Sequence, residues 1–416
     1  MFNFIKKYNQ INLFLLDQII VSFSNFLLTI ILVRFLGLVE FGVFSFFWIF
    51  LLLINSIQLS YIISPMLTNS AKKDVTSDLK TYLGSVLINQ ILFSILLFLL
   101  LIIFFKFFFN IFFIYKINSF YLSFFLLVFF SQFFLFFRKI YVCRVYIKKL
   151  IIIDVIYYIS TFSLLFNLIN SDNLNIQNVF LILIYANLLC TFFFYDLKKE
   201  IRFNLKSFFY SHKENWIISK WLLLTSITQW FSGNLWIINA GVILGPYYLG
   251  VIRCCQSILN VANLIFQTIE NVYSVKISKI YKVNSISFLK NYINKLTING
   301  IFLVLIISLL ISFFAEFLLN LIFGSEISSQ YYVLIYLSFL LPLTFLQYFP
   351  QHALRALSKT FSIFVAFFCS SMIAILFSSP IIKEFKIYGF VSGMYASQLV
   401  ILIIIYYNYF KEVNKD

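Results

Sequence analysis

Polar side chains recur at every third or fourth position of one otherwise apolar stretch, residues 250–275. They are Arg253, Gln256, Asn260, Asn263, Gln267 and Glu270. On an α-helix this spacing places all six on one face, over roughly 25 Å along the axis. Charged groups that face lipid near the bilayer centre cost several kcal/mol each, so this face must contact protein or water. Two interpretations follow: a set of interhelical hydrogen bonds, or the wall of a hydrated cavity whose charged ends bind a substrate or a coupling ion.

Shorter polar patterns lie in a second apolar stretch near the start of the chain. Asn25 belongs to a polar face that repeats over residues 18–29, and Asp17 lies beside that face. Arg34 follows at the end of the stretch, either as an anchor at the level of the lipid headgroups or as a cation of the same cavity. Asn25 and Arg34 are therefore further candidates for substrate binding.

Three carboxylates within or beside apolar stretches are candidates for coupling to an ion such as H⁺ or Na⁺. They are Asp17, Glu270 and Asp154. Asp154 has an alternative role, because it can pair with Lys148 or Lys149, which precede it closely. The chain has only two histidines, and its five cysteines show no C-x-x-C spacing, so we expect no metal site and no cofactor.

The amino-acid composition indicates that these apolar stretches lie in a membrane. The chain is 62% hydrophobic and 11% charged, whereas a soluble domain is about 45–50% apolar and about 25% charged. A bilayer core about 30 Å thick takes about 20 apolar residues per helix. Twelve stretches meet this length, at 12–33, 41–63, 83–105, 120–141, 150–169, 178–196, 220–243, 252–273, 295–318, 331–350, 361–379 and 388–410.

The loops between these spans alternate in charge. One side of the membrane receives 25 of the 31 Lys and Arg residues, and by the positive-inside rule that side faces the cytoplasm. An even number of spans places both termini there. The net charge of +16 is then mostly cytoplasmic surface charge near anionic lipid headgroups, and it requires no nucleic-acid partner.

Two loop motifs occur twice, about half the chain apart. The pattern L-G-x-x-x-[FL]-G stands at 36–42 and 244–250, an offset of 208 in a chain of 416 residues. The pattern R-x-x-x-K stands at 144–148 and 355–359, an offset of 211. Each half holds six spans, an even number, so both halves enter the membrane from the same side as a parallel repeat. Glycine provides the tight backbone and the close helix approach that such short connections need.

We therefore expect an all-α integral membrane protein with about twelve transmembrane helices, in two parallel-repeat six-helix bundles around a central cleft. The N-terminal bundle covers residues 1–196, a cytoplasmic linker 197–219, and the C-terminal bundle 220–416. This arrangement suits a transporter that opens alternately to the two faces of the membrane.

The same residues carry a family resemblance over essentially the whole chain. The segments VRFLGLVEFGVFSFF (33–47) and LGPYYLGVIRCCQSILN (244–260), with R-x-x-x-K after the fourth and tenth spans, resemble the polysaccharide transport family. Its members include the Wzx-like O-antigen flippases of the multidrug/oligosaccharidyl-lipid/polysaccharide exporter superfamily. These motifs are short and degenerate, so they indicate the family better than the substrate.

The resemblance implies a protein of the bacterial inner membrane that flips undecaprenyl-diphosphate-linked oligosaccharide from the cytoplasmic to the periplasmic leaflet. The cavity arginine expected at the start of the eighth span would be Arg253. A guanidinium suits a diphosphate, and Gln256 and Asn260 suit sugar hydroxyls. The implied partners are the lipid-linked oligosaccharide, membrane lipids, H⁺ or Na⁺, an O-antigen polymerase and a chain-length regulator. The product is an O-antigen of lipopolysaccharide, a capsule or another polymer.

Two alternatives remain at this point. A multidrug exporter of the same superfamily would share the fold, but it would favour an acidic cavity for cationic substrates. An integral-membrane O-antigen polymerase or glycosyltransferase would commonly present a sizeable outer loop with catalytic residues, whereas the outer loops here run to only about fifteen residues. We therefore expect a transporter and not an enzyme.

Overall fold

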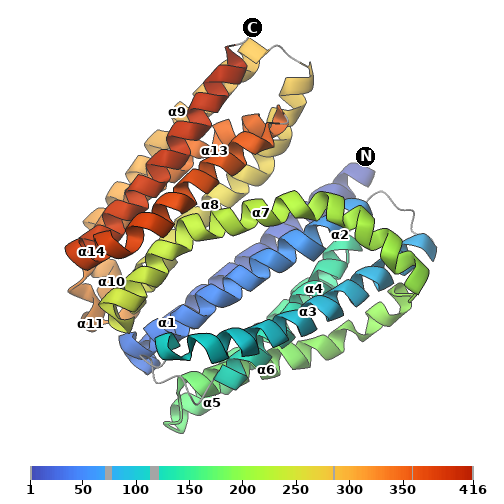
Figure 1. The fold of residues 1–416 in the computed structure, drawn as a ribbon, viewed down its shortest axis with the longest axis horizontal. Helices are drawn as coiled ribbons and strands as arrows, with labels where there is room; N and C mark the ends of the chain where they lie inside the picture. The colour runs from blue at the N-terminus through green and yellow to red at the C-terminus, as the bar shows by residue number, and fades with distance from the viewer. Residues whose placement is uncertain (1, 71–76, 113–120, 284–285, 358, 415–416) are drawn as a thin grey trace. The chain divides into compact units, whose positions relative to one another are not determined.

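The computed structural model describes the chain apart from residues 1, 71–76, 113–120, 284–285, 358 and 415–416. The side chains of 2–12, 77, 104–112, 205–206, 263–272, 274–276, 278–279 and 281–283 also lie outside the described set. The regular elements of the described residues are helices, with no strand among them (Figure 1). This confirms the all-α class.

The helices follow one another with short connections. The first part of the chain forms α1 (Phe2–Gln58), the π-helical turn η1 (Leu59–Ile63), α2 (Ser64–Ser70), α3 (Ser77–Phe112), α4 (Tyr121–Cys143), α5 (Ile147–Asn170), α6 (Ile176–Phe192) and the 3-10 helix η4 (Phe193–Glu200). The second part forms α7 (Leu205–Leu244), α8 (Pro246–Val283), α9 (Ile286–Phe313), α10 (Ala315–Phe323), α11 (Ser325–Ser328), α12 (Tyr331–Ser338), α13 (Leu340–Ala356) and α14 (Thr360–Val413).

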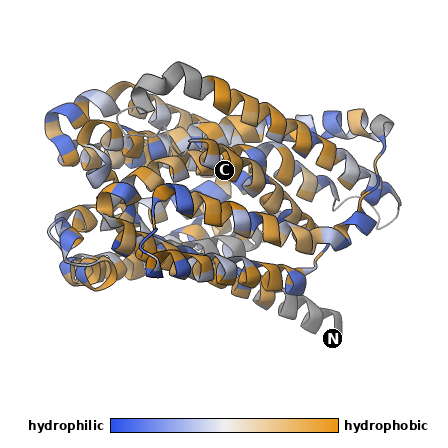
Figure 2. Cartoon of the chain, turned by 90° about the horizontal axis from the view of Figure 1, so that it is seen from below, coloured by the Kyte–Doolittle hydropathy of each residue, from blue (hydrophilic) through white to orange (hydrophobic). Residues whose placement is uncertain are grey.

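The helices match the twelve predicted spans once two breaks are counted. Eight helices of the described part are long and apolar enough to cross a membrane. Two of these, Leu13–Ser70 and Thr360–Val413, have 58 and 54 residues and are interrupted at Gly37 and Lys386, so each contains two spans. α7 and α8 supply the remaining two, with more polar residues along them. Hydrophobic colour predominates along most helices (Figure 2).

The chain divides into two compact units. Unit 1 comprises Met1–Leu36 and Phe47–Ser226, and unit 2 comprises Gly37–Phe46 and Ile227–Asp416. Within unit 1, α4 packs against α6 and α3, and α5 packs against α6. Within unit 2, α13 packs against α14, α9 and α8. The boundary falls inside α7, and the short segment after the first break of α1 belongs to unit 2.

The first glycine of each repeated loop sets the backbone. Gly37 has a φ of 80° and Gly245 a φ of 94°, a region that L-residues rarely adopt. A Cβ at either position would meet nothing within 4 Å. These two glycines are therefore required by conformation and not by space, and each ends one span and begins the next.

The second glycine of each loop allows a close approach, and the two loops lie against each other within unit 2. A Cβ on Gly42 would stand 1.8 Å from the carbonyl oxygen of Pro246 and 3.1 Å from the nitrogen of Gly250. A Cβ on Gly250 would stand 2.4 Å from the carbonyl oxygen of Leu38. The two copies of the motif thus form one reciprocal contact, and this confirms the predicted role of glycine.

The second repeated motif makes an ionic contact in each unit, through its arginine in unit 1 and through its lysine in unit 2. In unit 1, Arg144 after α4 pairs with Glu200 at the end of η4. In unit 2, Lys359 before α14 pairs with Glu412 near the end of α14, at 3.3 Å. The two acidic residues are 212 positions apart, close to the offset of 211 between the motifs. Each copy of the motif therefore pairs with an acidic residue, but a different member of the motif makes the pair in each unit.

Candidate functional site

The polar face of α8 begins two turns into the helix. α8 starts at Pro246, directly after the positive-φ Gly245, and proline is favoured in the first turn because its missing N–H is not needed there. Arg253 is half-buried, and its Nη1 donates a hydrogen bond to Oε1 of Gln256 at 3.0 Å. The neighbouring Cys254 is fully buried in the core of the unit.

The helix continues through the rest of the predicted face. Asn260 is exposed in the structure, one turn beyond Gln256. Asn263, Gln267 and Glu270 lie within α8, but their side chains fall outside the described residues. The contact of Arg253 with Gln256 and the exposure of Asn260 agree with one polar face, and its continuation to Glu270 stays a prediction.

The charge of Arg253 is not balanced by a carboxylate in the described part of the chain. Its hydrogen-bond partner is the neutral amide of Gln256. The partly buried Arg138 and Arg144, by contrast, both pair with carboxylates. A guanidinium that keeps its full charge in a partly desolvated place binds an external anion strongly, because the local dielectric is low.

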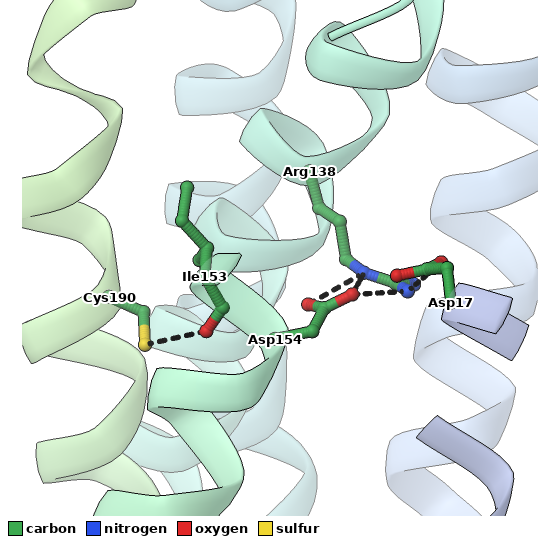
Figure 3. A network of polar contacts seen from close by, with 5 residues as sticks. All are labelled: Asp17, Arg138, Ile153, Asp154 and Cys190. Carbon is green, nitrogen blue, oxygen red and sulfur yellow. Dashed lines mark hydrogen bonds and ion pairs between the residues drawn. The ribbon is translucent and has the colours of Figure 1, made fainter. Parts of the chain in front are cut away.

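The two predicted carboxylates of unit 1, Asp17 and Asp154, meet at one arginine (Figure 3). Nε of Arg138 donates to Oδ1 and Oδ2 of Asp154 at 3.0 and 2.9 Å, and Nη2 donates to Oδ2 at 2.7 Å. Nη2 also donates to Oδ2 of Asp17 at 2.8 Å. Helices α1, α4 and α5 each supply one member of this Asp17–Arg138–Asp154 cluster.

This cluster corrects the predicted partner of Asp154. Pairing with Lys148 or Lys149 was wrong, because Lys149 Nζ bonds Asp196 at 2.5 Å and Asp154 bonds Arg138. Arg138 lies on the last turns of α4, near the end of the predicted span 120–141. No local pattern indicated its role, because its partners are 121 and 16 residues away.

Further polar side chains lie close to the Asp17–Arg138–Asp154 cluster. Lys139 follows Arg138 and lies close enough to both carboxylates to interact with them electrostatically. Tyr158, one turn beyond Asp154 on α5, lies near Arg138 and near the predicted binding residue Asn25. Asn25 itself is exposed. Asn25 thus stands at the edge of the cluster in unit 1.

The last candidate for substrate binding, Arg34, is also exposed and lies three residues before the break at Gly37. Arg34 and Asn25 belong to unit 1, whereas the polar face of α8 belongs to unit 2. Their part in substrate binding stays a prediction.

A set of buried amides in unit 1 was missed in the sequence. Gln58 Nε2 donates to Oε1 of Gln90 at 2.9 Å and to the carbonyl oxygen of Gln132 at 2.7 Å. Gln132 Nε2 donates to Oδ1 of Asn55 at 2.7 Å. Gln58 also directly precedes the π-helical turn η1, a feature often found at functional sites. The sequence feature that could have predicted this set is the single glutamine within each of three otherwise apolar spans.

Metal-binding groups are absent from the described residues, where no three His, Cys, Asp or Glu side chains gather as ligands. The five cysteines are all free thiols, and Cys190, Cys254 and Cys255 are buried.

Comparison of the sequence with known proteins gives one relative of limited similarity. No family model matches the sequence. The capsular polysaccharide biosynthesis protein CapF of Staphylococcus aureus is 26% identical over 250 residues, which are 58% of this chain and 61% of CapF. The match thus spans less than two thirds of that relative's length.

Solved structures match over nearly the whole chain. The lipid II flippase MurJ in an inward closed conformation gives a TM-score of 0.73 at 14% identity, covering 94% of this chain and 87% of MurJ. An inward-facing multidrug resistance MATE transporter of the MOP superfamily gives 0.72 at 11% identity, covering 94% of this chain and 96% of the transporter. The chain has the fold of the MOP-superfamily transporters. This confirms the fold to which the sequence resemblance pointed, and both solved neighbours are named as a flippase or a transporter.

Proposed function

We propose that this protein flips an undecaprenyl-diphosphate-linked oligosaccharide from the cytoplasmic to the periplasmic leaflet of a bacterial inner membrane. The two six-helix bundles, predicted as 1–196 and 220–416, would move as bodies to open the site alternately to each face. No covalent chemistry is needed. Arg253 holds the diphosphate, Gln256 and Asn260 hold sugar hydroxyls, and the lipid tail stays in the bilayer.

One observation carries this proposal: Arg253 is a partly buried cation whose partner in the described residues is an amide. A site for cationic drugs would place carboxylates at this point, because opposite charges attract most strongly where water is excluded. A diphosphate instead supplies the missing negative charge and accepts bidentate hydrogen bonds from the guanidinium. The neighbouring amides can donate to and accept from hydroxyl groups.

The comparisons support the same direction. MurJ is named as a lipid II flippase, and it shares the fold. CapF is named for capsular polysaccharide biosynthesis, and it is similar in sequence over part of the chain. We propose that the product is a surface glycan, either O-antigen or capsule, with a polymerase and a chain-length regulator as partners.

Coupling to H⁺ or Na⁺ is a further part of the proposal. Asp17 and Asp154 are the candidate residues in unit 1, and Glu270 is the candidate on α8. The salt bridge to Arg138 means that an incoming cation must compete with a guanidinium for the same carboxylates. The cluster can therefore exchange ions only if Arg138 moves away from at least one carboxylate during transport.

The test is complementation of a strain that lacks its own lipid-linked-oligosaccharide flippase and makes the matching repeat unit. Surface glycan and accumulated lipid-linked repeat unit are measured together. We expect the wild-type chain to restore the glycan and clear the intermediate. Arg253→Ala should abolish both effects at unchanged membrane abundance, whereas Lys295→Ala, which removes an exposed cation of α9, should behave as wild type.

Two outcomes would count against the proposal. If the membrane-inserted wild-type chain leaves the matching repeat unit inside, the flippase function is wrong, and drug efflux by a MATE-like exporter becomes the function to measure. If the wild-type chain flips the substrate and Arg253→Ala does so equally well, flipping stands but Arg253 is not the diphosphate ligand.

A further inference from the structure

The first half of α7 has its polar side buried and its aromatic side exposed. Ser211, Asn215 and Ser219 recur every four residues and are buried. Asn215 Oδ1 accepts hydrogen bonds from Asn69 Nδ2 at 2.9 Å and from the hydroxyl of Tyr82 at 2.8 Å. This side of the helix is therefore fixed to unit 1 by hydrogen bonds.

The opposite side of the same helix is apolar and basic. Its exposed members recur with helical spacing and form one face. They are Phe209, Lys213, Trp216, Ile217, Lys220, Trp221 and Leu224. Phe209 is 74% exposed, Ile217 61% and Trp221 59%. A helix in water buries such apolar side chains, so we expect this face to contact lipid or protein and not water.

The length of α7 locates this face at the membrane boundary. Its 40 residues extend about 60 Å, twice the roughly 30 Å of a bilayer core. The sequence predicts the membrane-crossing part at 220–243, so residues 205–219 extend beyond the hydrocarbon core. Tryptophan and tyrosine together with lysine are typical of the headgroup layer, where the rings lie among lipid carbonyls and the ammonium groups reach outward.

The chain just before α7 has the same character. Phe192, Tyr195 and Phe203 are 80%, 73% and 64% exposed. Three exposed basic residues lie between Tyr195 and Phe203, namely Lys198, Lys199 and Arg202. Cation–aromatic contacts occur along this stretch, with Lys198 Nζ 5.7 Å from the ring centroid of Tyr195 and Lys220 Nζ 5.8 Å from that of Trp221. Residues 192–221, called here the interface segment, thus combine exposed rings with cations.

The charge of the interface segment is strongly positive. It holds six basic residues and three acidic ones. Two of the acids are already paired with cations outside the segment: Asp196 with Lys149 and Glu200 with Arg144. The described basic side chains of the segment are exposed and have little compensating charge within it; they are Lys198, Lys199, Arg202, Lys213 and Lys220. Their natural counter-ions at a membrane boundary are lipid phosphates.

We propose that the interface segment lies in the headgroup layer and binds anionic phospholipid headgroups. It selects the leaflet that the positive-inside pattern assigns to the cytoplasm. The rings of Phe209, Trp216 and Trp221 enter the acyl boundary, while Lys213 and Lys220 contact phosphates. Hydrogen bonds through Asn215 attach the segment to unit 1. This binding is independent of any transported substrate.

The test uses the native tryptophans as reporters of the purified full-length protein in phosphatidylcholine vesicles. Trp230 and Trp236 are buried, whereas Trp216 and Trp221 are exposed. Acyl-brominated phosphatidylglycerol and acyl-brominated phosphatidylcholine are compared as quenchers at the same mole fraction. The signal from the two exposed rings is the difference between wild type and Trp216→Phe/Trp221→Phe.

We expect this signal to show about two- to five-fold enrichment of the anionic over the zwitterionic quencher, falling with salt. Lys213→Gln/Lys220→Gln should remove most of that preference and keep quenching by brominated phosphatidylcholine. The matched control is Lys295→Gln/Lys411→Gln, which removes two exposed cations of unit 2 and should leave the preference unchanged.

Three results would overturn the proposal. Equal quenching of the wild type by both lipids would show that the segment does not select anionic headgroups. If Lys213→Gln/Lys220→Gln kept the preference for anionic lipid, basic residues other than Lys213 and Lys220 would be responsible for it. Quenching of Trp216 and Trp221 by aqueous iodide but by neither lipid would place the face in water, where a protein partner would have to cover it.

Discussion

Replacing Arg138 by methionine should destabilise unit 1 strongly. The side chains of Arg138, Asp17 and Asp154 are only 16%, 8% and 3% exposed, so removal of the cation leaves two carboxylates in a poorly solvated place. Breaking one buried pair in this way costs about 3–5 kcal/mol. The loss here should be at the upper end, because Asp154 loses three short contacts and Asp17 loses its ion pair.

The compensating variant separates charge from packing. Asp17→Asn/Arg138→Met/Asp154→Asn removes all three charges at nearly constant volume, and buried pairs replaced by neutral groups are often tolerated. We expect it to regain most of the lost stability. The assay is thermal unfolding in one detergent, where Arg138→Met should lower the midpoint on the order of 10 °C.

The same two variants bear on ion coupling. If the cluster only holds α1, α4 and α5 together, the triple variant should both fold and flip substrate. If its carboxylates exchange an ion, the triple variant should fold but fail to flip. An unfolding midpoint for Arg138→Met equal to that of wild type would refute the reasoning, because no strongly desolvated pair would then exist at Arg138.

Two further predictions concern the repeated contacts. Gly250→Ala should lower the unfolding midpoint more than Gly233→Ala on α7, because the new methyl group would meet the backbone of Leu38 whereas the site at Gly233 is open; equal midpoints would contradict the close approach. Glu200→Gln should destabilise the protein more than Glu412→Gln, because the Arg144 side chain is 9% exposed and that of Lys359 is 47% exposed. Exposed ion pairs contribute only about 0–1 kcal/mol. Denaturation of both variants at two salt concentrations measures the two losses, and a larger loss for Glu412→Gln would contradict the prediction.

Local patterns in the sequence were sufficient for the helices and for the repeat. Span length and loop charge depend on neighbouring residues, so they could be predicted without contacts. The glycine motif was informative for the same reason. Gly37 and Gly245 are needed by their own φ angles, whereas Gly42 approaches the backbone of Pro246 in the other half of the chain, a partner that local patterns do not give.

The charged cluster could not be predicted, because it depends on packing between distant segments. Arg138 meets Asp17 across 121 residues, and no short-range spacing in the sequence connects the two. Asp154 and Lys149 are close in sequence, yet each bonds a different partner in the structure. The orientation of α7 was hidden for a related reason, since only the structure shows that the side carrying Asn215 is buried.

Some features of the chain occur in both halves, whereas the charged cluster occurs in one half alone. A positive-φ glycine follows the first span of each half, at Gly37 and Gly245, and an ionic contact follows the fourth span of each half, so these features maintain the fold. The charged cluster has no copy: at offsets of 208 and 211, Asp17 corresponds to Thr225, Arg138 to Phe349 and Asp154 to Val365.

Arg253 also stands alone, because the residue at the same place in the first half is Ser45, which is buried. A charge that only maintained the shared fold would be needed in both halves, and a buried charge costs free energy even when it is paired. The unrepeated charges are therefore where function should be sought. In the proposed function, the half-buried Arg253 of unit 2 would hold the anionic substrate. Asp17 and Asp154 of unit 1, which pair with Arg138, would exchange an ion.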